Sequence, residues 1–168
     1  MKPFIGLKRL WYGNPLTAKP TSIELLNVAG MTEIKNVHQG TWSYTQDDPE
    51  VTDYKNELTG NNYYRDMTAQ GAKNINFTIG EYDFDTRVAL QGGKYENGVW
   101  EAPTELALIN KCIVAQTKTG HYICFPNASI VTKVDTQEKN LGLGIVATAV
   151  EDTTNGLADE YWFNSEHS

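Results

Sequence analysis

Three carboxylates stand at alternate positions within the stretch FTIGEYDFDTRVALQGG, at Glu81, Asp83 and Asp85. Such a group can hold a metal ion, supply a catalytic acid and base, or begin a helix. An EF-type calcium loop needs a glycine at its sixth position and a glutamate at its twelfth, but counting from Glu81 these positions hold Thr86 and Gly92. A glycosidase needs two carboxylates that flank a sugar, whereas alternate residues of an extended segment point the same way and repel each other.

The start of a helix explains these acids better. A carboxylate at Asp83 or Asp85 would accept hydrogen bonds from the free N–H groups of a short helix over 83–91, whose dipole also favours the charge. Gly92 and the glycine after it would end this helix. Two alternatives stay open: the three acids could form a salt bridge between subunits, with Arg87 in the same group, or they could bind a metal ion.

Other chemical signatures are weak. His38, His121 and His167 are far apart and lack the spacing of zinc ligands, so we expect ordinary surface or turn histidines. Cys112 and Cys124 form no CxxC pair, and we expect buried free thiols. No serine stands in a G-x-S-x-G context. We therefore expect no catalytic residue, no metal site and no cofactor.

Composition favours one acidic, strand-rich domain. The chain has 168 residues, a net charge of −7 and a pI near 4.9, so it should not hold nucleic acid by neutralising phosphates. Its 14 Gly, 9 Tyr and 4 Trp, with many β-branched residues, favour strands. We expect no signal peptide, because the N-terminal segment lacks an apolar core. We also expect no membrane span, because no apolar stretch approaches about 18 residues.

Hydrophobic periodicity predicts a mainly β fold of about seven to nine strands with one or two short helices. A tight turn is expected at Asn97-Gly98, and the lone glycine pair Gly142 and Gly144 should mark a bulge or a close backbone approach. The expected elements are a strand over 3–12, a short helix over 21–30 with a Thr21/Glu24 capping box and Gly30 at its end, strands over 40–45 and 73–79, the helix over 83–91, a hairpin over 105–117 and 121–130, a short strand over 129–136, and a strand over 141–153 before a polar tail over 154–168.

A long polar segment separates two of these strands. Residues 46–72 are net acidic and contain Pro49, Gly60 and Gly71. Compact domains rarely carry unstructured loops of more than about 15 residues without a functional reason. We expect its ends to extend the flanking strands into a hairpin and its tip to be mobile in the free protein.

Small, uncharged polar residues recur on the predicted strands, alternating with apolar neighbours. They are Ser43, Thr45, Asn74, Asn76, Thr78 and Thr148. An ordinary solvated sheet face is one interpretation, but such faces commonly carry many Lys and Glu. The other interpretation is a surface past which something charged moves without sticking.

Four segments, in this order, resemble the major tail tube proteins of long-tailed, siphophage-type bacteriophages. They are GTWSYTQDDPEVTDYKNELTGNNYYRD, NINFTIGEYDFDTRVALQGGKYENGVWEAP, VAQTKTGHYICFPNASIV and LGIVATAVED. The resemblance is one of order and texture and covers roughly residues 40–153; the N-terminal segment, 1–39, matches less clearly.

This resemblance implies a single-domain β-sandwich or half-barrel with a flanking helix, similar to the tube proteins of contractile tails and type VI secretion. Copies would form hexameric rings that stack into a tube through which DNA passes, so the protein would be no enzyme. Its expected partners are itself and the tape-measure, tail initiator and terminator proteins, in the virion tail after assembly in the bacterial cytoplasm. The polar stripes would face the lumen. The long loop would reach the next ring through candidate residues Asp47, Asp48, Glu50, Asp53, Lys55, Glu57, Tyr63, Tyr64 and Arg65.

Two functions compete with this one. The first is a monomeric β-sandwich module that binds a sugar or a peptide on the aromatic platforms Trp11, Trp42, Trp100 or Trp162. The second is a small enzyme that uses the three acids near the predicted helix.

Overall fold

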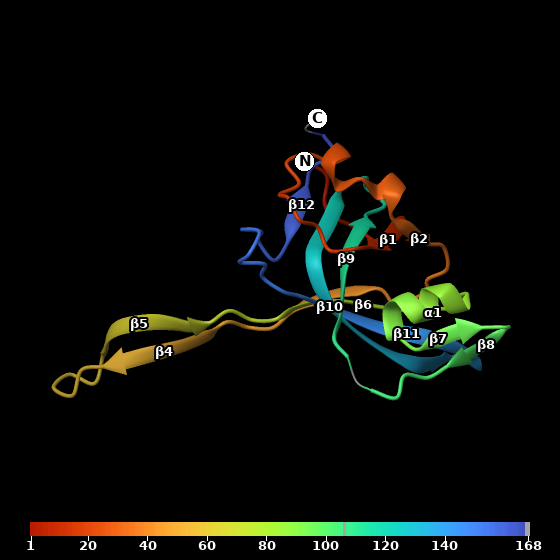
Figure 1. Cartoon of the computed structure of the whole chain (residues 1–168). Coiled ribbons are helices and arrows are strands. Elements are labelled where there is room, and N and C mark those ends of the chain that lie inside the picture. Colours follow the sequence, from red (N-terminus) through yellow and green to blue (C-terminus); the bar gives the residue numbers. More distant parts are fainter. Residues whose placement is uncertain (106, 167–168) are drawn as a thin grey trace.

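A computed structural model describes residues 1–105 and 107–166 (Figure 1). The fold is mainly β with one short α-helix, as the composition and periodicity predicted. In chain order the elements are β1 (Arg9–Gly13), the 3-10 turns η1 (Glu24–Leu26) and η2 (Val28–Gly30), β2 (Thr32–Ile34), β3 (Ser43–Gln46), β4 (Glu50–Lys55), β5 (Asn62–Ala69), β6 (Lys73–Ile79), α1 (Phe84–Gln91), β7 (Lys94–Glu96), β8 (Val99–Glu101), β9 (Ile109–Gln116), β10 (Tyr122–Gln137), β11 (Asn140–Ala149) and β12 (Tyr161–Phe163).

One antiparallel sheet forms the body, in the order β2-β1-β9-β10-β11-β6-β3, with β12 paired to the start of β10. The sheet curls without closing. The segment after β2 returns to the far end of the sheet, where the N–H of His38 donates to the carbonyl of Thr78 at 2.8 Å and the N–H of Gly80 donates to Asn36 at 3.2 Å. The expected sandwich-like half-barrel is thereby confirmed.

Two apolar cores explain two different sequence patterns. Along β9, Ile113 and Ala115 face the main core, whereas Cys112 and Val114 face a second core beneath η1 and η2. Both faces of this strand are buried, so its sequence is a continuous apolar run. Along β6, only the face of Phe77 is in the main core, and the sequence alternates.

The N-terminal predictions were partly wrong. The first strand begins at Arg9 and not near residue 3. The helix expected over 21–30 is two 3-10 turns, because Asn27 adopts a left-handed conformation with φ 52° and interrupts it. The Thr21/Glu24 capping box does not form, and Gly30 lies inside η2. So short a segment gains too few hydrogen bonds to sustain an α-helix without packing.

The C-terminal half has more strands than expected. The structure describes twelve strands and not seven to nine. The short strand predicted over 129–136 is the second half of β10, which runs for 16 residues. The strand predicted over 141–153 is β11, which ends at Ala149. The segment predicted as a polar tail contains one more strand, β12, which pairs with Tyr122–Cys124. At Asn97-Gly98 the expected tight turn joins β7 to β8, with both residues at positive φ.

The long polar segment forms a projecting hairpin, which we call the arm (residues 47–72). Strands β4 and β5 pair from Glu50 and Ala69 to Lys55 and Asn62, so the expected hairpin extends almost to the tip. The arm leaves the body as a narrow ribbon (Figure 1). A Cβ at Gly71 would collide with the carbonyl of Asp47, so the two chains cross closely at the base.

Candidate interaction surfaces

The acid-rich stretch forms a helix junction. Asp83 is the N-cap of α1, and its Oδ1 accepts a hydrogen bond from the N–H of Thr86 at 2.9 Å. This bond lowers the pKa of Asp83 below its usual value. Asp85 lies in the first turn, exposed to solvent. Of the two aspartates predicted as caps, the geometry therefore assigns that role to Asp83.

The remaining members of that group point elsewhere. The Arg87 guanidinium stacks on the ring of Trp100 at 3.7 Å and donates through Nε to Gln91 at 2.9 Å. Glu81 is exposed before the helix. Within residues 1–105 and 107–166, no three His, Cys, Asp or Glu side chains form a group suited to a metal ion. The described geometry thus gives no site in which the acids act together.

The polar stripes gather on one open face of the sheet, which we call the polar face. Strand register places Ser43 opposite Asn76, and Thr45 opposite Asn74, while Asn74 also lies opposite Thr148. The Nδ2 of Asn76 donates to the hydroxyls of Ser43 and Thr45 at 3.3 Å, and the Thr148 hydroxyl donates to Asn74 Oδ1 at 2.7 Å. These side chains satisfy one another and form a continuous surface over β3, β6 and β11.

Charged residues complete the polar face, and the sequence reasoning missed them. Thr78, only 4% exposed, donates its hydroxyl to Asp135 Oδ2 at 2.7 Å. Two hydrogen bonds lower the pKa of Asp135; the one from Gln137 has the larger effect, and the one from Thr78 comes second. Lys133 lies two residues earlier on the same face of β10. The alternation of β10 from Val131 onward could have revealed them.

Two strand edges beside the polar face have no partner among the described residues. β3 pairs only with β6. Residues 131–137 of β10 pair with β11 on one side, and β9 pairs with β10 only up to Ile130. The four strands β10, β11, β6 and β3 therefore begin and end on free edges.

The arm is exposed on both faces along its strands. The rings of Tyr54 and Tyr64 lie 5.7 Å apart, and Arg65 pairs with Asp53 at 3.3 Å. At the tip, Leu58 is 93% exposed. The other residues predicted to contact a neighbouring ring are distributed along the arm: Asp47 and Asp48 at the base, Glu50 and Lys55 on β4, Glu57 at the tip and Tyr63 on β5.

The four tryptophans do not form a shared platform. Trp11 is buried in the second core, and Trp42 packs against the main core. The Trp100 ring lies under the guanidinium of Arg87, and the ring of Trp162 packs against Phe4 in a tilted arrangement. The described geometry therefore keeps the four side chains apart, and Trp162 is the one among them with a largely exposed ring, at 45%.

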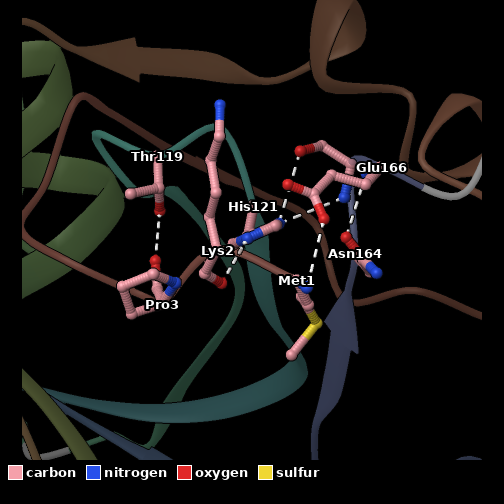
Figure 2. Close-up of polar contacts among 8 residues, drawn as sticks. Met1, Lys2, Pro3, Thr119, His121, Asn164 and Glu166 are labelled. Carbon is pink, nitrogen blue, oxygen red and sulfur yellow. Dashed lines mark hydrogen bonds and ion pairs between the residues drawn. The ribbon is translucent and has the colours of Figure 1, made fainter.

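The prediction for His121 was wrong, because this side chain is fully buried between the two ends of the chain (Figure 2). Its Nδ1 accepts from the N–H of Ser165 at 3.2 Å, so Nε2 carries the proton and donates to the carbonyl of Lys2 at 2.8 Å. Phe4 packs on the ring at 4.6 Å. His38 lines a surface groove, and His167 lies outside the described residues.

The cysteines are free and buried, as expected. Their sulfurs lie 3.9 Å apart. This contact is the larger cause, and burial the second cause, of a raised pKa at Cys124. A thiol that stays protonated is a poor nucleophile.

No protein-family model matches this sequence, and a search of curated proteins returns no match. None of the helices in the described part of the chain has both the length and the apolar character needed to cross a membrane.

Proposed function

We propose that this protein is a structural subunit that assembles into hexameric rings, and that the rings stack into a tail tube of the phage type. The observation that carries this proposal is the pair of free strand edges on either side of the polar face. Unpaired edges are templates for pairing with another chain. A contact between two different edges is heterologous, and it closes into a ring when its rotation divides a full turn.

The direction of the strands supports such a joint. β10, β11, β6 and β3 alternate in direction, so β3 of one copy meets β10 of the next in antiparallel orientation. With four strands from each copy of a hexamer, roughly 24 strands at a spacing of about 4.8 Å give a circumference of about 115 Å and a diameter of about 37 Å. The main core lies on one side of this sheet, which leaves the polar face for the lumen.

The chemistry of the polar face suits a passage for DNA. Its residues are mostly small, neutral and hydrogen-bonded to one another. The chain as a whole is acidic, so phosphates would be repelled and not captured. This role needs no reaction centre, and it places the protein in a virion tail.

The arm is the element that would join one ring to the next. It contributes no buried residue to the body, so removing it should cost the body little stability. We expect deletion of residues 48–68 to leave a folded domain that forms rings but not long tubes. Circular dichroism checks the fold, and negative-stain microscopy of the concentrated protein checks the assembly.

Two results would contradict the proposal. Long tubes from the truncated chain would remove the stacking role of the arm. A full-length protein that stays monomeric at high concentration would contradict assembly itself, and glycan binding by that monomer would favour the sugar-binding alternative.

A further inference from the structure

A basic groove lies on the surface of the body. Its rim carries four cations: Lys8 just before β1, Arg9 at the start of β1, Lys35 after β2 and Lys118 in the turn after β9. The groove has a volume of about 310 Å³, and its lining residues in the described chain include no carboxylate. In a protein with a net charge of −7, such a collection of cations indicates an acidic occupant.

Three of these cations are free. Arg9 is already engaged, because its guanidinium donates twice to Glu33 at 3.0 Å. Lys8, Lys35 and Lys118 are exposed, and no described residue forms an ion pair with them. Three ammonium groups around one groove repel each other, and an anion between them relieves this repulsion.

The floor of the groove is apolar. Leu10 and Ile34 belong to the main core, and Trp42 packs against it. An occupant that fits therefore combines carboxylates for the rim with an apolar side chain for the floor.

The arm has this combination. It contains six carboxylates and two cations, so its net charge is −4. At its tip Leu58 is 93% exposed and follows Glu57. The tip is shaped by its own hydrogen bonds, since Asn56 Oδ1 accepts from the N–H of Leu58 at 2.8 Å and the carbonyl of Asn56 accepts from Gly60 at 2.7 Å.

An arm cannot fill the groove of its own copy in this geometry. Residues 47–55 extend it about 30 Å from the body at about 3.3 Å per residue. In Figure 1 the arm points to the left, whereas β1 and β2 lie to the right of β10. The occupant with the matching charge is therefore the arm of a second copy.

We propose that the basic groove is the receptor for the acidic arm of another copy, with Leu58 on the apolar floor and the carboxylates nearest the tip, Glu57 first, facing Lys8, Lys35 and Lys118. This contact rests on the proposed function and identifies both sides of the ring-to-ring joint. It is heterologous, so it repeats along a stack and does not end at a dimer.

A charge exchange tests the contact. One full-length variant carries Lys8→Glu, Lys35→Glu and Lys118→Glu, and a second carries Asp53→Lys, Glu57→Lys and Asp66→Lys, at the three arm carboxylates nearest the tip. Each alone should raise the concentration needed for stacking about tenfold or more, since several ion pairs become repulsions. Both sets together in one chain should restore stacking. A matched control, Lys19→Glu, Lys94→Glu and Lys139→Glu, changes the net charge equally at exposed positions outside the groove and should leave stacking unchanged.

Sedimentation and negative-stain microscopy give separable outcomes. Wild-type tubes with no effect of the groove variant would overturn the groove and leave the tube function standing. Failure of the combined variant to stack would show that the groove takes another acidic partner. An equal loss of stacking in the control would show that only net charge matters. Either result overturns the proposal. A wild-type protein that remains monomeric would overturn both the groove and the tube.

Discussion

The ion-pair cluster at the base of the arm gives the sharpest stability prediction. Lys73, the first residue of β6, is 14% exposed, and its Nζ lies 3.0 Å from Asp159 Oδ2 and 3.2 Å from Glu160 Oε1. Glu160 Oε2 also accepts from the hydroxyl of Tyr44 at 2.5 Å and from the indole of Trp162 at 3.0 Å. One ammonium group thus joins the start of β6 to the segment that leads into β12.

We expect Lys73→Met to lower the free energy of unfolding by about 2 kcal/mol. The change leaves two adjacent carboxylates without a counter-charge. Breaking a fully buried pair costs about 3–5 kcal/mol, and exposed pairs contribute about 0–1 kcal/mol. Asp159 and Glu160 are 31% and 20% exposed, so this site lies between those limits. For a chain of this size, about 2 kcal/mol corresponds to a fall in Tm of about 4–8 °C.

The pH dependence follows from Lys73. Desolvation lowers its pKa, but the hydrogen bonds and charges of Asp159 and Glu160 outweigh that effect and raise the pKa above 10.5. A raised pKa means that the ammonium stabilises the fold fully at neutral pH and that this contribution is lost as the pH rises through the folded pKa. On the alkaline side, the difference between wild type and Lys73→Met should therefore shrink only in strong alkali.

Urea unfolding followed by circular dichroism measures these values. In a background with Asp159→Asn and Glu160→Gln, Lys73→Met should cost about 0.5 kcal/mol or less, because no carboxylate is left unpaired. Lys94→Met, at an exposed residue of β7, serves as the control and should stay within about 0.5 kcal/mol of wild type. An equal cost of Lys73→Met in both backgrounds would refute the reasoning.

Three further changes test other parts of the structure. Asp83→Ala removes the cap of α1 and should lower the free energy of unfolding by about 1 kcal/mol, whereas Asp85→Ala should change it by no more than about 0.5 kcal/mol. Because the pKa of Asp83 is lowered in the folded state, the difference between the two variants should vanish as the pH falls through that pKa. A difference that stays constant in acid would count against the cap. Asn76→Lys places a cation on the polar face and should hinder DNA passage more than assembly, so normal infectivity of a phage that carries it would exclude that face from the lumen. Gly93→Ala should destabilise the fold by about 2 kcal/mol or more, because its Cβ would collide with a backbone carbonyl. Gly98→Ala has open space around it and should show only the strain of its positive φ, about 1 kcal/mol. Equal losses of stability in thermal unfolding would disprove the collision.

Local patterns predicted the elements that local physics controls. The alternation of Asn74, Asn76 and Thr78 gave the limits of β6, and the aspartates with Gly92 gave those of α1. The polar stripes gather on one face because of the register between strands. Alternation predicts which residues of a single strand share a face, but it does not predict how neighbouring strands are aligned. Alternation could have placed Asp135 on a strand face, but its hydrogen bond with Thr78 could not be foreseen, because the two residues are 57 positions apart in the sequence.

Long-range contacts explain the errors. Nothing around His121 in the sequence indicates burial, because the groups that cover it come from Lys2 and Ser165 at the two ends of the chain. The arm strands carry polar residues on both faces, so their pairing depends on backbone hydrogen bonds without a hydrophobic period to reveal it. The expected short helix over 21–30 failed for a local reason, because Asn27 adopts a left-handed conformation between two short 3-10 turns.

The two halves of β10 differ in their pairing. From Tyr122 to Phe125 the strand pairs with β9, and its first three residues pair with β12 on the other side. A register shift follows between Phe125 and Ala128, after which the pairing with β9 continues to Ile130. From Val131 to Gln137 it pairs with β11 and, among the described residues, with no other strand, and Val131 is 61% exposed. In the part of the chain that the structure describes, this second half leaves one row of backbone N–H and C=O groups unpaired beside an exposed apolar side chain, and such an edge is a template for pairing with another chain.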